Sequence, residues 1–416
     1  MKKVIVIGGG ASGLMAAYAA AENGKDVTLL EKNEKLGKKI YITGKGRCNL
    51  TNDCSPDEFL SNVVRGGKFL TRTAYAFPPD RTMQFFEQNG LSLKVERGNR
   101  VFPVSDHASD VTKTLEQACR RVGVQMKLGE TVTKIGIESE TVRSVATQSA
   151  KYECDSVIVA TGGLSYPSTG STGDGYRFAE EAGHAIVSPV PSLVGLELAE
   201  DVSAAQGISL KNAVLSARRK GKVIFSEMGE LLFTHYGISG PLVLSLSALI
   251  NRLPMDELTL LIDFKPALDK KKLDERLLRD FVERKNEQMK NVMRGLLPAG
   301  LNDLVLRAAS VSARKQANGV TREERGRILN ALKAFSLTPT ALRGFTEAVV
   351  TSGGVDCGKI DPKTMESKLI KGLYFCGEVL DCDAYTGGFN LQIAFSRVIL
   401  PAKMHKMIIY KVICQT

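Results

Sequence analysis

The segment Val4-Ile5-Val6-Ile7-Gly8-Gly9-Gly10-Ala11-Ser12-Gly13 decides the fold class of this 416-residue chain. Its four β-branched residues form a short apolar run typical of a buried strand, and a GxGxxG pattern separates that run from an alanine-rich stretch with helical spacing. In such a turn Gly8 permits a tight bend, Gly10 lets the backbone approach a pyrophosphate, and Gly13 allows the helix to pack closely on the sheet. The phosphates would lie at Ala11 and Ser12, against the free N–H groups and the positive dipole end of the helix.

A second strand completes this unit. The pattern predicts a strand over residues 2–7, a helix over 12–23 and a strand over 26–31, which together form a βαβ unit. Glu31 ends the second strand, where a carboxylate can accept hydrogen bonds from both hydroxyls of an adenosine ribose. The unit predicts a dinucleotide site, although Glu31 and Lys32 alone do not separate FAD from NAD.

The composition is ordinary for a soluble globular protein. Apolar residues make up 43% of the chain and charged residues 24%, which excludes disordered, collagen-like and coiled-coil classes. Glycine numbers 39, whereas an average usage of about 7% would give about 29. The length predicts two or three domains.

The net charge and the cysteine pattern indicate which kinds of binding partner and metal site to expect. The net charge of +11 favours anionic partners, but its densest run, Lys270 to Lys272, is followed by Asp274 and Glu275. We interpret such mixed runs as solvated helix faces in preference to a nucleic-acid patch. Eight cysteines without a CxxC pair, and only four histidines, predict reduced thiols and no metal site.

The N-terminal stretch superficially resembles a signal peptide, because Lys2 and Lys3 precede apolar residues up to Ala21. The glycines of the turn would break an apolar helix, and the stretch leads directly into a second strand. No other apolar run reaches the length of about 18 residues that a membrane helix needs. A cytoplasmic protein with no membrane partner is therefore expected.

Four further glycine clusters occur along the chain. They are Thr43-Gly44-Lys45-Gly46-Arg47-Cys48-Asn49-Leu50-Thr51-Asn52; Ala160-Thr161-Gly162-Gly163 with Thr169 to Gly175; Gly353-Gly354-Val355; and Gly377-Glu378-Val379-Leu380-Asp381 with Thr386-Gly387-Gly388-Phe389-Asn390. A chain that returns to its nucleotide near the end favours FAD, because the long ribityl-isoalloxazine reaches across to the last strand. There is no second GxGxxG on a βαβ unit, so NAD(P)H would have to dock transiently as an electron donor.

These motifs resemble a bacterial FAD-binding oxidoreductase family described as aminoacetone-oxidase-like and as bile-acid-pathway flavoprotein reductases. Its FAD domain is similar to those of glutathione reductase and fumarate reductase. The resemblance runs from Val4 to about Ala394 and includes the segment Gly229 to Pro241. Beyond Ser396 the chain departs from the family pattern, which puts its last helix in doubt.

The resemblance implies a role for each cluster. The loop from Gly44 to Asn49 would wrap the pyrophosphate and ribityl chain, with Arg47 donating to phosphate. The backbone of Val132 would meet the adenine, and Glu378 or Asp381 would bind ribityl hydroxyls. The residues expected to bind non-covalent FAD are Gly8, Gly10, Ala11, Ser12, Gly13, Glu31, Lys32, Gly44, Lys45, Gly46, Arg47, Cys48, Asn49, Val132, Ala160, Thr161, Gly162, Gly377, Glu378, Asp381, Gly388, Phe389 and Asn390. The helix opened by the last three would direct its positive end at flavin N1 and O2.

The expected fold class is α/β, with a Rossmann-type FAD-binding domain split in sequence by an inserted β-rich and helical domain. The FAD domain comprises residues 1–190 and 346–416, and the insert comprises 191–345, β-rich over 191–265 and helical over 266–345. Within it we expect turns at Gly221 and Gly229 and charged helices over 268–340. In the second part of the FAD domain we expect a strand over Leu373 to Val379 and a helix over Phe389 to Leu400.

The catalytic residues are less well marked. Tyr166, His235 and Tyr236 are candidate proton donors, and the alternative, a core or hinge role, remains open. Cys48 with Cys54, and Cys376 with Cys382, suggest a flavin-coupled disulfide as a minor alternative, because their spacings differ from that of the disulfide reductases.

The expected function is an FAD-dependent oxidoreductase that acts on a small organic substrate through hydride transfer to or from the flavin. Two activities remain open: an amine oxidase that uses O₂, and an NAD(P)H-dependent reductase of conjugated enones. A basic flavin-bearing protein that binds nucleic acid is the alternative from another class.

Overall fold

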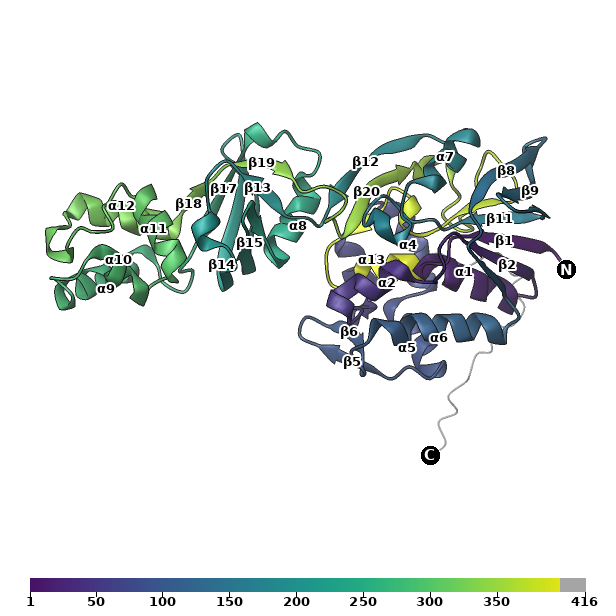
Figure 1. Cartoon of the computed structure of the whole chain (residues 1–416), viewed down its shortest axis with the longest axis horizontal. Coiled ribbons are helices and arrows are strands. Elements are labelled where there is room, and N and C mark those ends of the chain that lie inside the picture. Colours follow the sequence, from purple (N-terminus) through teal and green to yellow (C-terminus); the bar gives the residue numbers. More distant parts are fainter. Residues whose placement is uncertain (397–416) are drawn as a thin grey trace, which may run out of the picture. The chain divides into compact units, whose positions relative to one another are not determined.

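The strand β1 (Lys3–Ile7) lies at the centre of a five-stranded parallel sheet in the computed structural model, which describes residues 1–396 (Figure 1). The strand order is β21-β11-β1-β2-β7, and the added strands are β2 (Asp26–Glu31), β7 (Gln125–Leu128), β11 (Ser156–Val159) and β21 (Leu373–Phe375). The apolar run of β1 is buried on both faces, as parallel strands require. The expected α/β Rossmann-type class is confirmed.

Alternate residues of β1 pack into two different hydrophobic cores, one on each face of the sheet. Val4 and Val6 pack with the helix α1 (Ala11–Glu22) and the helix α6 (Ala108–Arg121). Ile5 and Ile7 pack against the antiparallel meander of β8 (Val132–Glu138), β9 (Thr141–Thr147) and β10 (Lys151–Glu153), and against α7 (Asp174–Glu181). The sheet is therefore covered on both faces.

Two compact units account for the chain. Within the described residues, one contains Met1–Val190 and residues 350–396, and the other is the continuous segment Pro191–Val349. The first unit also contains α2 (Lys38–Ile42), β3 (Thr51–Asn52), α3 (Pro56–Ser61), β4 (Val63–Arg65), α4 (Gly67–Ala76), α5 (Pro79–Gln88), β5 (Leu93–Glu96), β6 (Arg100–Pro103), most of β12 (Ile186–Ser192), β20 (Val350–Val355), β22 (Asp383–Ala384) and α13 (Phe389–Ser396). The part of the expected last helix beyond Ser396 lies outside the described residues.

The second unit is built on a seven-stranded antiparallel sheet with the order β18-β17-β14-β15-β16-β13-β19. These strands are β13 (Leu196–Leu198), β14 (Ser209–Arg219), β15 (Lys222–Phe233), β16 (Gly237–Ser239), β17 (Leu258–Asp263), β18 (Phe335–Leu337) and β19 (Pro339–Leu342). The helix α8 (Pro241–Ile250) precedes β17. Between β17 and β18 come α9 (Lys270–Glu283), α10 (Met289–Val292), α11 (Ala299–Ala308) and α12 (Arg322–Lys333), drawn in green in Figure 1. Sheet and helices share one core, which includes Leu260, Leu277 and Leu304.

Three local expectations were wrong. The stretch expected to be helical up to residue 340 ends earlier, because α12 stops at Lys333 and the following residues form β18 and β19, which pair into the antiparallel sheet. Gly221 lies in the hairpin turn between β14 and β15, but β15 continues through Gly229. A Cβ at Gly229 would lie 3.1 Å from Leu242, so this glycine makes room for α8 rather than a turn. The predicted strand from Leu373 ends at Phe375, because residues 377–379 form a 3₁₀ turn that begins at Gly377 with φ +78°. Among residues 1–396, no helix has the length and apolar content needed to cross a membrane.

Candidate dinucleotide site

The turn between β1 and α1 separates two kinds of glycine. A Cβ at Gly8, which has φ +107°, would lie 2.6 Å from the carbonyl oxygen of Ala160, and one at Gly13 would lie 1.8 Å from that of Gly8. Nothing lies within 4 Å of a Cβ built at Gly10. The helix that starts at Ala11 has no side-chain cap and no acid in its first turn. Free N–H groups and open space therefore meet at Gly10, which is what an anionic ligand requires.

The carboxylate of Glu31 is fixed beside this turn. One oxygen accepts a hydrogen bond from the backbone N–H of Gly9 at 2.6 Å, and the other accepts from the backbone and side chain of Asn33 at 2.8 and 2.6 Å. The side chain is buried, with 8% exposed. Lys32 points to other partners, the hydroxyl of Thr172 at 2.6 Å and the carboxylate of Asp174 at 2.7 Å.

The loop after α2 contains a buried polar atom without a partner. Among residues 1–396, the side-chain oxygen of Asn49 has no hydrogen-bond partner, and the preceding Cys48 is buried with φ +60°. Gly44 and Lys45 both have left-handed backbone conformations. The loop thus combines a sharply turning backbone at Gly44 and Lys45 with one buried acceptor, the Asn49 oxygen, that no described residue satisfies.

Arg47, expected to donate to phosphate, has acidic partners in the structure. Its guanidinium donates to Asp106 at 2.8 Å, forms an ion pair with Glu96, and stacks 4.3 Å from the ring centroid of Phe102. Lys94 also binds Asp106, and the bonds from Lys94 and Arg47 lower the pKa of this carboxyl. The described contacts therefore give Arg47 a structural role, and its phosphate role stays a prediction.

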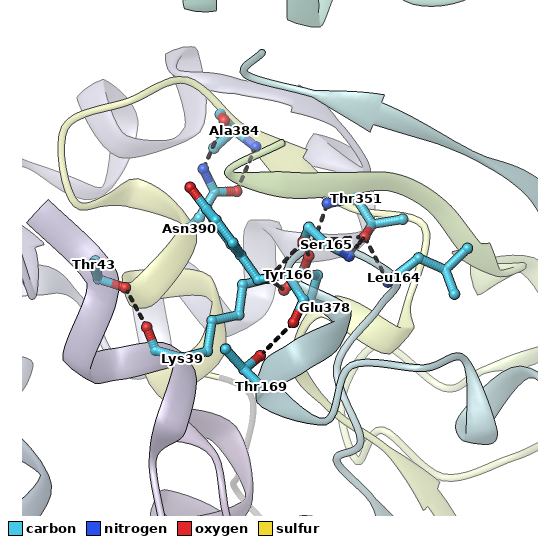
Figure 2. Close-up of polar contacts among 10 residues, drawn as sticks. All are labelled: Lys39, Thr43, Leu164, Ser165, Tyr166, Thr169, Thr351, Glu378, Ala384 and Asn390. Atoms are coloured by element: carbon cyan, nitrogen blue, oxygen red, sulfur yellow. Dashed lines mark hydrogen bonds and ion pairs between the residues drawn. The ribbon is translucent and has the colours of Figure 1, made fainter. Parts of the chain in front are cut away.

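A polar cluster surrounds Glu378, just after β21 (Figure 2). One of its oxygens receives the ammonium of Lys39 at 2.7 Å, and the other receives the Ser165 hydroxyl at 2.7 Å and the backbone N–H of Thr351 at 2.8 Å. Lys39 also donates to Ser165 at 2.6 Å. Burial raises the pKa of Glu378, but the charge and hydrogen bonds of Lys39 and the bonds from Ser165 and Thr351 outweigh it, and the pKa lies below its usual value.

The sequence did not single out Lys39, Ser165 or Thr351. These residues come from α2, from the segment after β11 and from β20, up to 339 positions apart from Glu378. No spacing pattern links them, since their meeting depends on the topology of the sheet. A glycine cluster before Ser165 and another after Thr351 were the only sequence signals near them.

Asp381 and Asn390 shape the last loop of the unit. Asp381 accepts two bonds from the guanidinium of Arg65, at 2.9 and 2.8 Å. Asn390 holds both backbone groups of Ala384, accepting from its N–H at 3.0 Å and donating to its carbonyl at 2.8 Å (Figure 2). A Cβ at Gly388 would lie 2.3 Å from the Thr51 carbonyl oxygen, so α13 starts against the strand β3 with Phe389 buried.

The described residues fit a bound dinucleotide. The strand end Ala160-Thr161-Gly162 lies against the Gly8 turn, and the buried hydroxyl of Thr161 has no hydrogen-bond partner in the part of the chain that the structure describes. The Thr161 hydroxyl and the Asn49 side-chain oxygen are therefore two polar atoms that a bound ligand can satisfy, and Gly10 adds open space beside the helix start. Val132, the expected adenine contact, is buried at the start of β8.

The candidate proton donors fall in different units. Tyr166 lies in the first unit, next to Ser165, in a left-handed conformation with φ +52°, and its carbonyl accepts from Thr169 (Figure 2). His235 and Tyr236 lie in the second unit with ring centroids 5.0 Å apart, and the guanidinium of Arg343 stacks on Tyr236. Their catalytic roles stay predictions.

The two cysteine pairs considered as a minor alternative do not form disulfides. Burial raises the pKa of the Cys48 thiol to about 12 and that of Cys54 to about 11, so both are poor nucleophiles near neutral pH. Cys382 lies 3.7 Å, sulfur to sulfur, from Cys357.

Known proteins resemble this chain over nearly its whole length. It is 32% identical over 408 residues to a 3-dehydro-bile acid delta(4,6)-reductase of Clostridium scindens, covering 95% of this chain and 97% of the relative. It is also 32% identical over 399 residues to a ribosomal RNA dihydrouridine synthase of Haemophilus influenzae, covering 94% and 95% of the two chains.

A solved 3-ketosteroid-delta4-(5alpha)-dehydrogenase from Rhodococcus jostii, in complex with 4-androstene-3,17-dione, shares the fold, with a TM-score of 0.52, 14% identity and 97% of both chains covered. A flavocytochrome c3 fumarate reductase also shares it, with a TM-score of 0.51, 18% identity, and coverage of 95% of this chain and 77% of the other.

The model of the HI0933-like protein Rossmann domain matches residues 2–404. The enzyme class expected from the sequence, an FAD-dependent oxidoreductase, is confirmed by these relatives. Because this model covers nearly the whole chain and a relative 32% identical covers 95% of it, the chain belongs to the HI0933-like family of Rossmann-domain flavoproteins.

Proposed function

We propose that the protein is an FAD-dependent reductase of a carbon–carbon double bond conjugated to a carbonyl group, with NAD(P)H as a transient electron donor. The observation that carries the proposal is the full-length similarity to two relatives, a bile-acid delta(4,6)-reductase and a dihydrouridine synthase. The 4,6-diene of a 3-oxo steroid and the C5=C6 bond of uracil are both conjugated to a carbonyl. One reaction type therefore serves both named substrates.

Reduction of such a double bond needs only a hydride and a proton, which a flavin and one acidic side chain provide. Bound FAD, once reduced by NAD(P)H, would supply the hydride for the β-carbon of the conjugated system. The electron pair of the double bond moves toward the carbonyl oxygen, and a proton then adds to the α-carbon. Tyr166 is the proposed proton donor in the first unit, because it directly follows Ser165 of the Glu378 cluster and carries a hydroxyl suited to general acid catalysis.

The chain's own residues would hold and orient the cofactor. The N–H groups at the start of α1 would bind the pyrophosphate in the open space at Gly10. Glu31 would accept from the ribose hydroxyls, because hydrogen bonds from Gly9 and Asn33 keep its carboxylate beside the turn. Glu378, kept ionised by Lys39, would accept from ribityl hydroxyls.

An anaerobic stopped-flow experiment tests the proposal. The purified protein should be yellow, NADH or NADPH should bleach its flavin absorbance, and a conjugated enone such as 4-androstene-3,17-dione or a uridine-containing RNA should restore it. Reoxidation by O₂ alone, together with flavin reduction by small amines, would instead establish an amine oxidase and overturn the proposal. Replacement of Tyr166 by Phe should slow reoxidation by the enone while leaving reduction by NAD(P)H unchanged.

A further inference from the structure

Two cysteine side chains of the first unit meet although they lie 25 positions apart in the sequence. The sulfur atoms of Cys357 and Cys382 are 3.7 Å apart, and both residues are present as thiols. A disulfide bond is about 2.05 Å long, so the two sulfurs need to approach by less than about 2 Å to form one. The pair is therefore placed for oxidation with little movement of the chain.

Backbone contacts hold the two segments together just before the cysteines. Val355 and Leu380 pair in a parallel bridge, and the backbone N–H of Asp381 donates to the carbonyl of Val355 at 3.1 Å. The sulfur of Cys357 lies 3.9 Å from the carbonyl oxygens of both Val355 and Asp381. The proximity of Cys357 to Cys382 thus depends on the paired backbone and not only on side-chain rotamers.

The two thiols differ in their access to solvent. Cys382 is buried, with 3% exposed, whereas Cys357 is half-buried between the exposed residues Asp356 and Gly358. A Cβ at Gly66 would lie 2.1 Å from the sulfur of Cys382, so this glycine leaves the space that the buried sulfur occupies. A dissolved oxidant therefore reaches Cys357 first, and Cys382 lies behind it as a resolving thiol.

The pair adjoins the polar cluster around Glu378. Cys382 directly follows the segment Glu378–Asp381, and Cys357 follows β20, whose Thr351 donates its backbone N–H to the Glu378 carboxylate at 2.8 Å. A bond between the cysteines would therefore join the two segments on which this carboxylate depends. A ligand held by such a segment leaves when the segment opens locally, and a cross-link makes that opening less frequent.

We propose that Cys357 and Cys382 form a redox site that a peroxide oxidises to a disulfide, and that this disulfide slows the release of FAD; the second part rests on the proposed function. The Cys357 thiolate attacks one peroxide oxygen, the O–O bond breaks, and the other oxygen takes up a proton and leaves as water. The Cys382 thiol then attacks the resulting sulfenic sulfur, the S–S bond forms, and the S–O bond breaks with release of a second water. Two thiols lose two electrons, which the peroxide gains, and an external dithiol restores both thiols by exchange.

Peptide mapping of the FAD-loaded full-length protein tests the site. The protein is treated with hydrogen peroxide, its remaining thiols are blocked with N-ethylmaleimide, and it is digested with trypsin and Glu-C without reduction. Cleavage after Glu378 separates Cys376 from Cys382. Mass spectrometry should then detect the Cys357 peptide linked to the Cys382 peptide, and dithiothreitol should separate them. Cys357→Ser and Cys382→Ser should each lose the linked species, whereas the matched control Cys54→Ser, at another half-buried cysteine, should keep it.

The rise of flavin fluorescence after dilution measures the release of FAD. The peroxide-treated protein should release FAD several-fold more slowly than the reduced protein, dithiothreitol should reverse the change, and peroxide should have no such effect on Cys357→Ser. Two unmodified thiols after peroxide treatment, or a link from either cysteine to a different one, would overturn the site. A complete disulfide with an unchanged release rate would overturn its coupling to the cofactor. If the disulfide forms but the protein takes up no FAD, the proposed function fails while the redox site stands.

Discussion

Two glycines of the first turn, Gly13 and Gly10, are needed for different physical reasons, close packing and space for a ligand. Gly13 has no room for a side chain, because a Cβ would lie 1.8 Å from the carbonyl oxygen of Gly8. Gly10 has φ −84° and open space around it, so the empty fold tolerates a side chain there. The same motif therefore combines one position needed for packing with one position left open for a ligand.

Substitution by alanine separates these two roles. Gly13→Ala should destabilise the protein, because the backbone of α1 must shift away from β1. Gly10→Ala should leave the thermal stability of the FAD-free protein nearly unchanged and reduce FAD retention several-fold, since the methyl group occupies the pyrophosphate space. The ratio of flavin to protein absorbance and the melting temperature measure the two effects. Full flavin occupancy in Gly10→Ala would contradict the assignment of this space.

Glu378 shows how a nearly buried carboxylate stays charged. Its usual pKa of 4.5 is lowered in the folded state despite burial, because Lys39, Ser165 and Thr351 stabilise the ionised form. The resulting stabilisation is present above pH 4.5 and is lost as the pH falls through the lowered value of the folded state.

Replacing Glu378 by Gln should lower the free energy of unfolding at pH 7 by about 1–3 kcal/mol, because Lys39 then loses its counter-ion and two donors lose a charged acceptor. The difference from the parent protein should shrink as the pH falls below the lowered pKa. Urea unfolding across acid pH measures it, with the exposed Glu180→Gln as the control. A difference that stays constant with pH would mean that charge is not the cause.

At the scale of elements, short-range side-chain patterns position the helices of both units. α3 and α12 each begin with a capping box, Ser55 with Glu58 and Thr321 with Glu324. These boxes satisfy backbone N–H groups that have no partner within the helix. Both can be identified from the sequence because their residues lie three positions apart.

Loss of the cap at α12 should have a measurable cost. Thr321→Ala removes the acceptor for the backbone N–H of Glu324 and should lower the free energy of unfolding by about 1 kcal/mol. Thr321→Ser keeps the hydroxyl and should keep most of the stability. Equal stability of the alanine and serine variants in urea unfolding would show that the hydroxyl contributes nothing.

At the scale of the whole molecule, the chain contains two compact units with separate cores. The candidate dinucleotide residues all lie in the unit made of Met1–Val190 and residues 350–396. Ligand binding stabilises the folded state of the unit that holds the ligand, by an amount that grows with the ligand concentration.

Scanning calorimetry of the full chain should therefore show two transitions. Added FAD should raise the midpoint of one transition progressively, while the midpoint of the other stays within error. A single transition that FAD shifts as a whole would show that the units unfold together.

Local features of this protein follow from neighbouring residues alone. The βαβ unit, the glycine turn, the carboxylate at the end of β2 and the hairpin at Gly221 depend on side-chain period and on sterics within a few positions. Two of the wrong expectations, the turn at Gly229 and the strand beyond Phe375, concern glycines. Residue type alone does not show whether a glycine makes room for a packed helix, as Gly229 does, or starts a 3₁₀ turn, as Gly377 does.

Contacts between segments that are distant in sequence could be identified only in the folded structure. Lys39 meets Glu378 across 339 positions, and Gln288 meets Gln316 in a pairing that no periodicity predicted. Arg47 binds Glu96 and Asp106, whereas the sequence allowed it to be read as a phosphate ligand. The physical reason is that local sterics limit each residue to a few backbone conformations, but the partner of a charged or amide side chain depends on which segments the strand order and the buried core bring side by side.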